Sequence, residues 1–130
     1  EGMSQTAEND LAPMKAFLTA GPHRKLTALA QLPPFLHREL EDEPLADVGA
    51  SYQVGCVVRG APLPLSRLLY ALAADERCLL LIESGGFAHT YRLRLYEKKG
   101  TGARLLCATY VPEPMADGAA ILAFLEGLAD

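Results

Sequence analysis

The feature that most constrains the fold is a series of short apolar segments, separated by turn signals, within residues 77–111. Residues 89–97 alternate strictly between apolar and polar side chains, which is the period of a β-strand with one buried face. An apolar segment, 77–83, precedes them, and another, 104–111, follows them. Because Gly85-Gly86 supplies the positive φ that a tight reversal needs, these segments predict neighbouring antiparallel strands.

Two earlier segments extend this pattern. Residues 51–59 alternate in the same way and predict a further strand. Residues 66–74 fit either a helix capped by Ser66 or a strand. We favour the strand, because the segment is short for a helix and Asp75-Glu76 provides a reversal into the next segment. In that strand, the apolar residues that share one face are Leu68, Tyr70 and Leu72.

Helices are expected on both sides of this strand-rich region of the sequence. Residues 9–20 place apolar side chains at helical spacing, whereas 24–32 have a weaker helical pattern and 35–43 allow one further short helix. Near the end of the chain, residues 117–129 predict an apolar helix that Asp117 caps.

The chain of 130 residues suits a single domain, 1–130. The order of elements predicts an α+β fold, with an antiparallel β-meander of four to five strands. We expect the N-terminal helices and the C-terminal helix to pack on one face of that sheet. The expected parts are a disordered tail (1–8), a helical segment (9–48), the antiparallel sheet (51–111) and the C-terminal helix (117–129).

The formal net charge of −4 argues against a nucleic-acid partner, because nucleic-acid-binding domains usually carry a basic surplus. The charge is unevenly distributed along the chain. Residues 1–50 hold eight acidic and four basic side chains, and residues 51–111 hold four acidic and eight basic ones. The sequence therefore predicts one acidic and one basic surface.

No apolar run approaches the roughly 20 residues that cross a bilayer, and no signal-peptide pattern is visible. Glu1-Gly2 resembles a remnant of cloning, which would make Met3 the native start. We therefore expect a cytoplasmic, bacterial protein without a membrane partner. A periplasmic protein whose signal peptide has been removed stays the alternative.

The three cysteines, Cys56, Cys78 and Cys107, each lie in an apolar segment and predict buried thiols. Neither they nor the three histidines have the spacing of metal ligands. The glycines form no phosphate-binding motif. The sequence therefore predicts neither a metal nor a cofactor.

The most distinctive local feature is the segment from Glu83 to His89. A hairpin there would bring these two side chains together, and a carboxylate beside an imidazole is the arrangement of a general base. Ser84 is the candidate nucleophile next to them. The simpler interpretation, which we favour, is a cross-strand polar pair at the end of the sheet with a solvated serine.

A second candidate site is a row of polar side chains, Arg92, Arg94 and Tyr96, on one strand face. Arg104 on the next strand lies beside the row if the register allows it. Guanidinium groups in such a row can clamp a carboxylate or phosphate, or meet an acidic partner protein. The simpler interpretation is a solvent-facing sheet surface.

These observations favour a non-catalytic protein-binding or accessory module, of the kind found among immunity proteins and chaperones. The alternative is a small-ligand-binding protein or enzyme with a polar site at the Gly85-Gly86 hairpin. A homodimer formed through a leftover apolar helix stripe is a third expectation.

Overall fold

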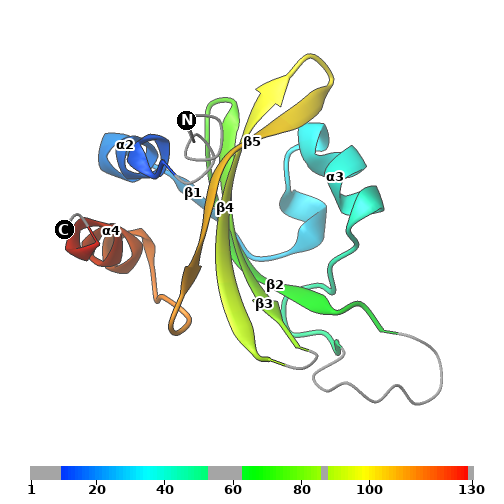
Figure 1. Cartoon of the computed structure of the whole chain (residues 1–130). Helices are drawn as coiled ribbons and strands as arrows, with labels where there is room; N and C mark the ends of the chain where they lie inside the picture. Colours follow the sequence, from blue (N-terminus) through cyan, green and yellow to red (C-terminus); the bar gives the residue numbers. More distant parts are fainter. Residues whose placement is uncertain (1–9, 53–62, 86–87, 129–130) are drawn as a thin grey trace, which may run out of the picture.

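The computed structural model describes residues 10–52, 63–85 and 88–128. Five strands form one antiparallel sheet in the order β1-β2-β3-β4-β5 (Figure 1). The α+β fold with an antiparallel meander is therefore confirmed. The strands are β1 (Arg24–Leu26), β2 (Ser66–Ala74), β3 (Arg77–Ser84), β4 (Thr90–Lys99) and β5 (Gly102–Val111). The helices are α2 (Ala12–Ala20), η1 (Leu29–Gln31), η2 (Pro34–Leu36), α3 (His37–Asp42) and α4 (Gly118–Gly127).

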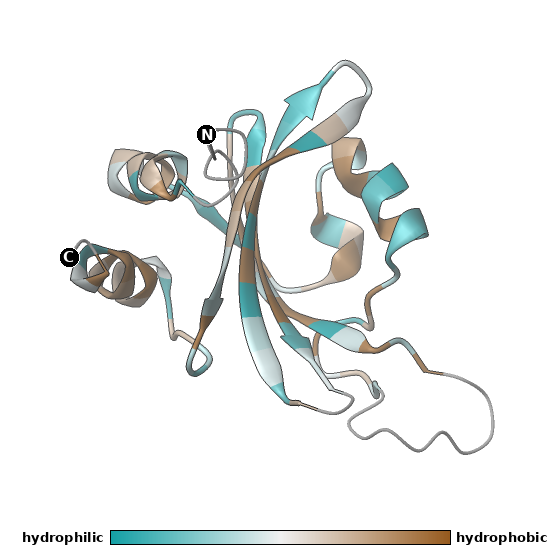
Figure 2. Ribbon diagram, viewed as in Figure 1, coloured by the Kyte–Doolittle hydropathy of each residue, from teal (hydrophilic) through white to brown (hydrophobic). Residues whose placement is uncertain are grey.

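Helices cover both faces of the sheet, which corrects the expectation that they all pack on one face. In Figure 1, α2 and α4 lie side by side over one face, and η2 and α3 lie over the other. Both helical layers carry apolar residues (Figure 2). The cause lies in β3, where Leu79 and Leu81 point to one face while Leu80 and Ile82 point to the other. A strand that is apolar on both faces needs a cover on each.

Two hydrophobic cores result, one on each side of the sheet. The α2/α4 core consists of Met14, Phe17, Leu18, Tyr70, Leu72, Leu79, Leu81, Leu93, Leu95, Cys107, Val111, Met115, Ile121 and Leu125. The α3 core consists of Leu26, Leu32, Phe35, Leu36, Leu45, Leu68, Ala71, Ala73, Cys78, Leu80, Ile82 and Tyr96.

The ambiguous segment 66–74 is a strand, as we favoured, but its expected facing is wrong at one position. Leu68 pairs with Ile82 and Tyr70 pairs with Leu81, so the register shifts between them. The extra residue in this β-bulge moves Leu68 to the α3 core, away from Tyr70 and Leu72 in the α2/α4 core.

The segment 24–32 is not the weak helix that its pattern predicts. Its first residues form β1, which pairs with the edge of β2 and buries Leu26 in the α3 core. Only the 3-10 turn η1 is helical, because Pro33 restricts the residue before it to an extended backbone. The short helix expected over 35–43 is present as η2 and α3.

Both terminal helices lie where the sequence predicts them. Asp117 caps α4 by accepting a hydrogen bond from the Ala120 amide (2.9 Å), and Asp10 accepts one from the Ala12 amide at the start of α2 (3.0 Å). In the described ranges, no helix has both the length and the apolar character needed to cross a membrane. The tail 1–8 and nearly all of the strand expected over 51–59 lie outside the described residues.

Candidate functional site

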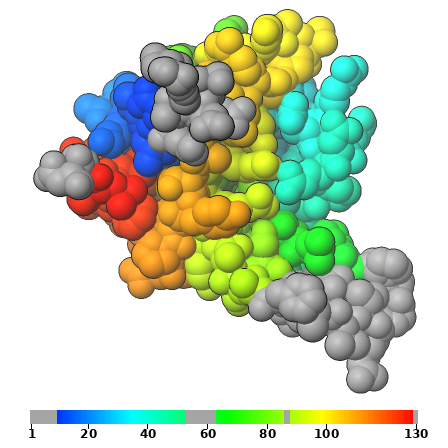
Figure 3. All heavy atoms as spheres, viewed as in Figure 1, coloured from blue at the N-terminus to red at the C-terminus, as the bar shows by residue number. Residues whose placement is uncertain are grey.

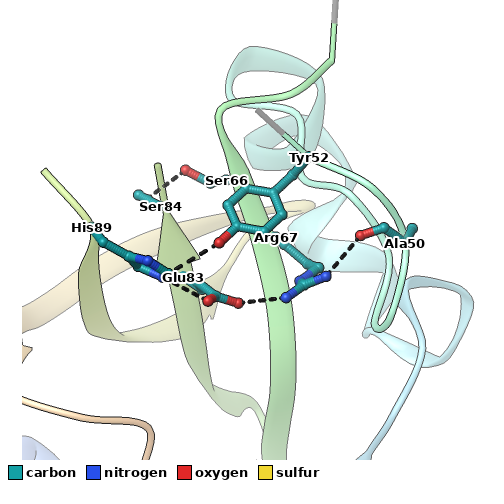
Figure 4. A network of polar contacts seen from close by, with 7 residues as sticks. All are labelled: Ala50, Tyr52, Ser66, Arg67, Glu83, Ser84 and His89. Atoms are coloured by element: carbon teal, nitrogen blue, oxygen red, sulfur yellow. Dashed lines mark hydrogen bonds and ion pairs between the residues drawn. The ribbon is translucent and has the colours of Figure 1, made fainter. Parts of the chain in front are cut away.

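A network of polar side chains occupies the end of the sheet where β3 stops and β4 starts (Figure 4). The register pairs Arg67 of β2 with Glu83 of β3, and Glu83 with Tyr91 of β4. Directly paired residues share a face, so these side chains lie on the same face as the α2/α4 core. Tyr52 and His89 reach this face from the segments that flank the strands.

Glu83 is the centre of the network, and its side chain is only 9% exposed. One carboxylate oxygen accepts a hydrogen bond from Arg67 Nη2 at 2.8 Å, and the other lies 2.6 Å from His89 Nε2. The Tyr52 hydroxyl lies 3.3 Å from the same histidine nitrogen. The structure thus brings Glu83 and His89 together, while their function stays a prediction.

Arg67 joins the network to the segment that precedes β2. Its Nη1 donates to the Ala50 carbonyl oxygen at 3.0 Å, and its guanidinium lies 4.5 Å from the centre of the Tyr52 ring. The His89 ring packs against Tyr91, with ring centres 5.1 Å apart, although its side chain is 48% exposed. Neither Arg67 nor Tyr52 figured among the sequence candidates, because a sequence does not show that residues so far apart meet. The signal in the sequence that could have found Arg67 was the expected pairing of 66–74 with 77–84. That pairing places Arg67 opposite Glu83.

The charge on Glu83 follows from these contacts. Burial raises the pKa of the carboxyl group, but hydrogen bonds from Arg67, His89 and Tyr52 outweigh it and lower the pKa of Glu83 below its ordinary value of 4.5. Burial and the neighbouring carboxylate raise the pKa of Tyr52. The network therefore contains an ionised carboxylate beside a protonated Tyr52 hydroxyl.

This lowered pKa predicts an acid-sensitive fold. Because Glu83 ionises below 4.5 in the folded state, its stabilising effect is complete above that pH and is lost as the pH falls through the folded-state pKa. We expect the difference in unfolding free energy between wild type and Glu83→Gln to shrink as the pH falls below about 4.5. Urea unfolding over a pH series measures this difference. Glu43 titrates in both proteins, so its contribution cancels when they are compared. The exposed Glu126→Gln serves as the control, and a difference that grows as the pH falls below about 4.5 would contradict the prediction.

Ser84 does not belong to this network, which corrects the suggestion that it is a nucleophile beside Glu83 and His89. Adjacent residues of a strand point to opposite faces, so Ser84 faces the α3 side. There its hydroxyl forms a 2.7 Å hydrogen bond with that of Ser66 on the paired strand. Ser84 is therefore not beside the pair Glu83–His89.

The row of Arg92, Arg94 and Tyr96 is present but is not a solvent-facing surface. Arg94 Nη1 donates to Glu43 at 2.7 Å, Arg92 Nη2 donates to the same carboxylate at 3.3 Å, and Tyr96 is buried in the α3 core. Burial raises the pKa of the Glu43 carboxyl group. The guanidinium groups of Arg94 and Arg92 have a larger, opposite effect, so the pKa of Glu43 lies below its ordinary value. These arginines thus join the sheet to the residue that follows α3.

Arg104 lies on the opposite face from that row. A register shift between Leu95 and Tyr96 places Arg104 opposite Glu97, with which it forms an ion pair. Arg77 approaches the same carboxylate at 3.5 Å. The β-bulge therefore separates Arg104 from the row and puts it on the same face as Cys107.

A hollow of about 460 Å³ lies on the α3 side, at the same end of the sheet as the Glu83 network. Two large apolar side chains border it and are exposed, Tyr110 at 64% and Leu65 at 56%. Leu65 was not among the sequence candidates, although its place in a proline-rich loop was the available signal. The other lining residues are Asp42, Glu43, Pro44, Pro64, Ser66, Ser84, Gly85, Thr90 and Arg92.

A larger hollow, of about 850 Å³, lies at the other end of the sheet between the end of α2 and the β2–β3 turn. Its largest apolar residue, Phe17, is buried in the α2/α4 core, and Glu97 in its lining is paired with Arg77 and Arg104. None of the sequence candidates lines it. We therefore regard the smaller hollow as the candidate binding site.

Of the three cysteines expected to be buried, Cys56 lies outside the described residues. Cys78 and Cys107 are free and buried, and burial raises the pKa of Cys78 to about 12 and also raises that of Cys107. Over residues 10–52, 63–85 and 88–128, no group of three His, Cys, Asp or Glu side chains is placed to hold a metal ion.

Comparison of the chain with models of known protein families, with curated proteins and with solved structures finds no match.

Proposed function

We propose that this protein is a non-catalytic protein-binding module that docks its partner at the smaller hollow. The observation that supports this most is the exposure of Leu65 and Tyr110 beside Arg92 at the hollow. Aromatic residues and arginine are enriched where protein interfaces gain most of their binding energy. Large apolar side chains gathered at one exposed place are typical of an interaction site.

Support for a non-catalytic role comes from the polar residues themselves. Both oxygens of Glu83 are occupied, by Arg67 and His89, and Ser84 lies on the other face of the sheet. The arginines of the row are held by Glu43. These groups connect the segments that surround the hollow and keep its border in place.

The charge beside the hollow indicates the chemistry of the partner. Asp42 is exposed and, within the described parts of the chain, forms no ion pair, while Glu43 is neutralised by two arginines. The exposed Glu41 adds a further negative charge nearby in the chain. We therefore expect a partner segment that inserts an apolar side chain between Leu65 and Tyr110 and carries a basic residue toward Asp42. Neutralisation of a basic partner, in the manner of immunity proteins or chaperones, fits this surface.

The test is capture of a partner by purified protein and by matched variants from cells of the organism that encodes it. We expect wild type and Leu128→Ser to retain the same stoichiometric protein, and Leu65→Ser to retain it on the order of tenfold less. Leu128 is the control because it is an exposed leucine on the opposite side of the sheet, at the end of α4. Native mass spectrometry identifies the complex. Equal retention by the two leucine variants would refute docking at the hollow.

A small polar ligand is the second candidate function, and the hollow itself favours it. Its volume lies in the range of small-molecule sites, and three hydroxyl groups, from Ser66, Ser84 and Thr90, line it together with Arg92. A small molecule retained in the native mass spectrum, with no captured protein, would favour this candidate over the first.

A further inference from the structure

The two edges of the sheet are very different. At one edge, β1 is three residues long and covers only part of β2. Beyond it, the backbone of Ala46 hydrogen-bonds with the backbone of Ser66 and Leu68 in β2. At the other edge, β5 runs for ten residues, and in the described part of the chain no strand pairs with its outer side. The lower half of β5, in orange, lies on the front surface of the molecule in Figure 3.

The sequence of β5 lacks most of the features that keep an edge strand from pairing. Arg104 is its single charged residue, and the strand contains no lysine and no proline. The β-bulge lies in its first half, so Cys107–Val111 keep a regular register with β4. An unpaired, regular and nearly uncharged edge is a template for another strand.

We propose that a second copy of this chain pairs with β5, antiparallel, to form one continuous ten-stranded sheet across a twofold axis. An antiparallel edge is self-complementary, because a strand rotated by half a turn presents the same donors and acceptors to its copy. The charges agree with this arrangement. Arg104 lies near one end of β5 and the exposed Glu113 lies just beyond the other, so antiparallel pairing brings each toward its opposite on the second copy.

This inference is independent of the proposed function, because the purified chain alone is sufficient for it. Leu65, the residue changed to test partner docking, lies beside β2, whereas Tyr110 of β5 borders both the hollow and the proposed dimer interface. The residues changed to test the dimer, Arg104 and Glu113, do not line the hollow, so the two tests can fail separately.

The first measurement is the mass of the purified protein in solution over a wide range of concentration, by light scattering and sedimentation. We expect the mass to rise toward twice the 14.0 kDa of the chain. Hydrogen exchange locates the interface, since the outward amides of Cys107–Val111 become protected as dimer forms. Mass that stays at one chain at every concentration overturns the proposal, and so does a dimer in which these amides exchange at the monomer rate.

Charge exchange tests the antiparallel orientation at two exposed side chains, of which Arg104 also pairs with Glu97 in its own copy. Glu113→Arg and Arg104→Glu should each weaken self-association on the order of tenfold, since each places like charges at both ends of the interface. Mixing the two variants should restore association, because the heterodimer has opposite charges at both ends. Glu126→Arg and Arg38→Glu, at exposed helical positions, are the matched controls and should dimerise like wild type. Variants that dimerise like their controls, or a mixture no tighter than either variant alone, would overturn the antiparallel pairing.

Discussion

Replacement of Glu83 by alanine is expected to lower the free energy of unfolding by about 3 kcal/mol. The change removes the acceptor of the hydrogen bonds from Arg67 and His89 and leaves the Arg67 guanidinium without its carboxylate. Removing one partner of a buried ion pair costs more than the pair contributes, because the remaining charge stays poorly solvated. The Arg67 side chain is 25% exposed, so we expect the lower end of the range for such changes.

Urea unfolding at neutral pH measures this loss, with the exposed Glu126→Ala as a control that should change little. The double variant Glu83→Ala/Arg67→Met provides a second comparison. It should be more stable than Glu83→Ala alone, because no unpaired charge remains near the sheet. A loss below about 1 kcal/mol for Glu83→Ala would show that the network contributes little to the fold.

The second large effect concerns two adjacent residues of β3. Leu80→Ala and Leu81→Ala are each expected to lower the free energy of unfolding by about 3 kcal/mol. Leu80 is buried in the α3 core and Leu81 in the α2/α4 core, so each change leaves a cavity under a different helical layer. A sheet covered on one face would make only one of these two substitutions costly.

Chemical denaturation of the two variants, with the exposed Leu65→Ala as a control, tests this arrangement. The two side chains pack in different cores and share no core partners, so we expect the losses to be nearly additive in the double variant. A marked difference, with one substitution close to the control, would mean that one helical layer packs only loosely on the sheet.

Much of the backbone could be predicted from local pattern. The alternation of residues 89–97 predicted β4, and Asp117 predicted the start of α4, because both depend on neighbours in the chain. The expected hairpin between β3 and β4 allowed Glu83 and His89 to meet, and only the structure shows that their side chains do. The failure at 24–32 has the opposite cause, since pairing of β1 with the edge of β2 overrode a weak helical preference.

The candidate site could be predicted only in part, because its geometry depends on register and on contacts distant in sequence. Period two puts Ser84 and Glu83 on opposite faces, although Ser84 was expected beside Glu83. The same period did not predict the face on which Leu68 and Arg104 lie. A single extra residue in a β-bulge changes the face of every side chain beyond it.

The sequence by itself determined the meander, since strand period, turn glycines and helix caps are properties of consecutive residues. Only the tertiary structure decided that Glu43 holds the arginine row, that Arg67 and Tyr52 complete the Glu83 network, and that helices cover both faces of the sheet. The physical reason is that such contacts join residues tens of positions apart. Their partners are selected by the burial and charge of the assembled sheet rather than by local preference.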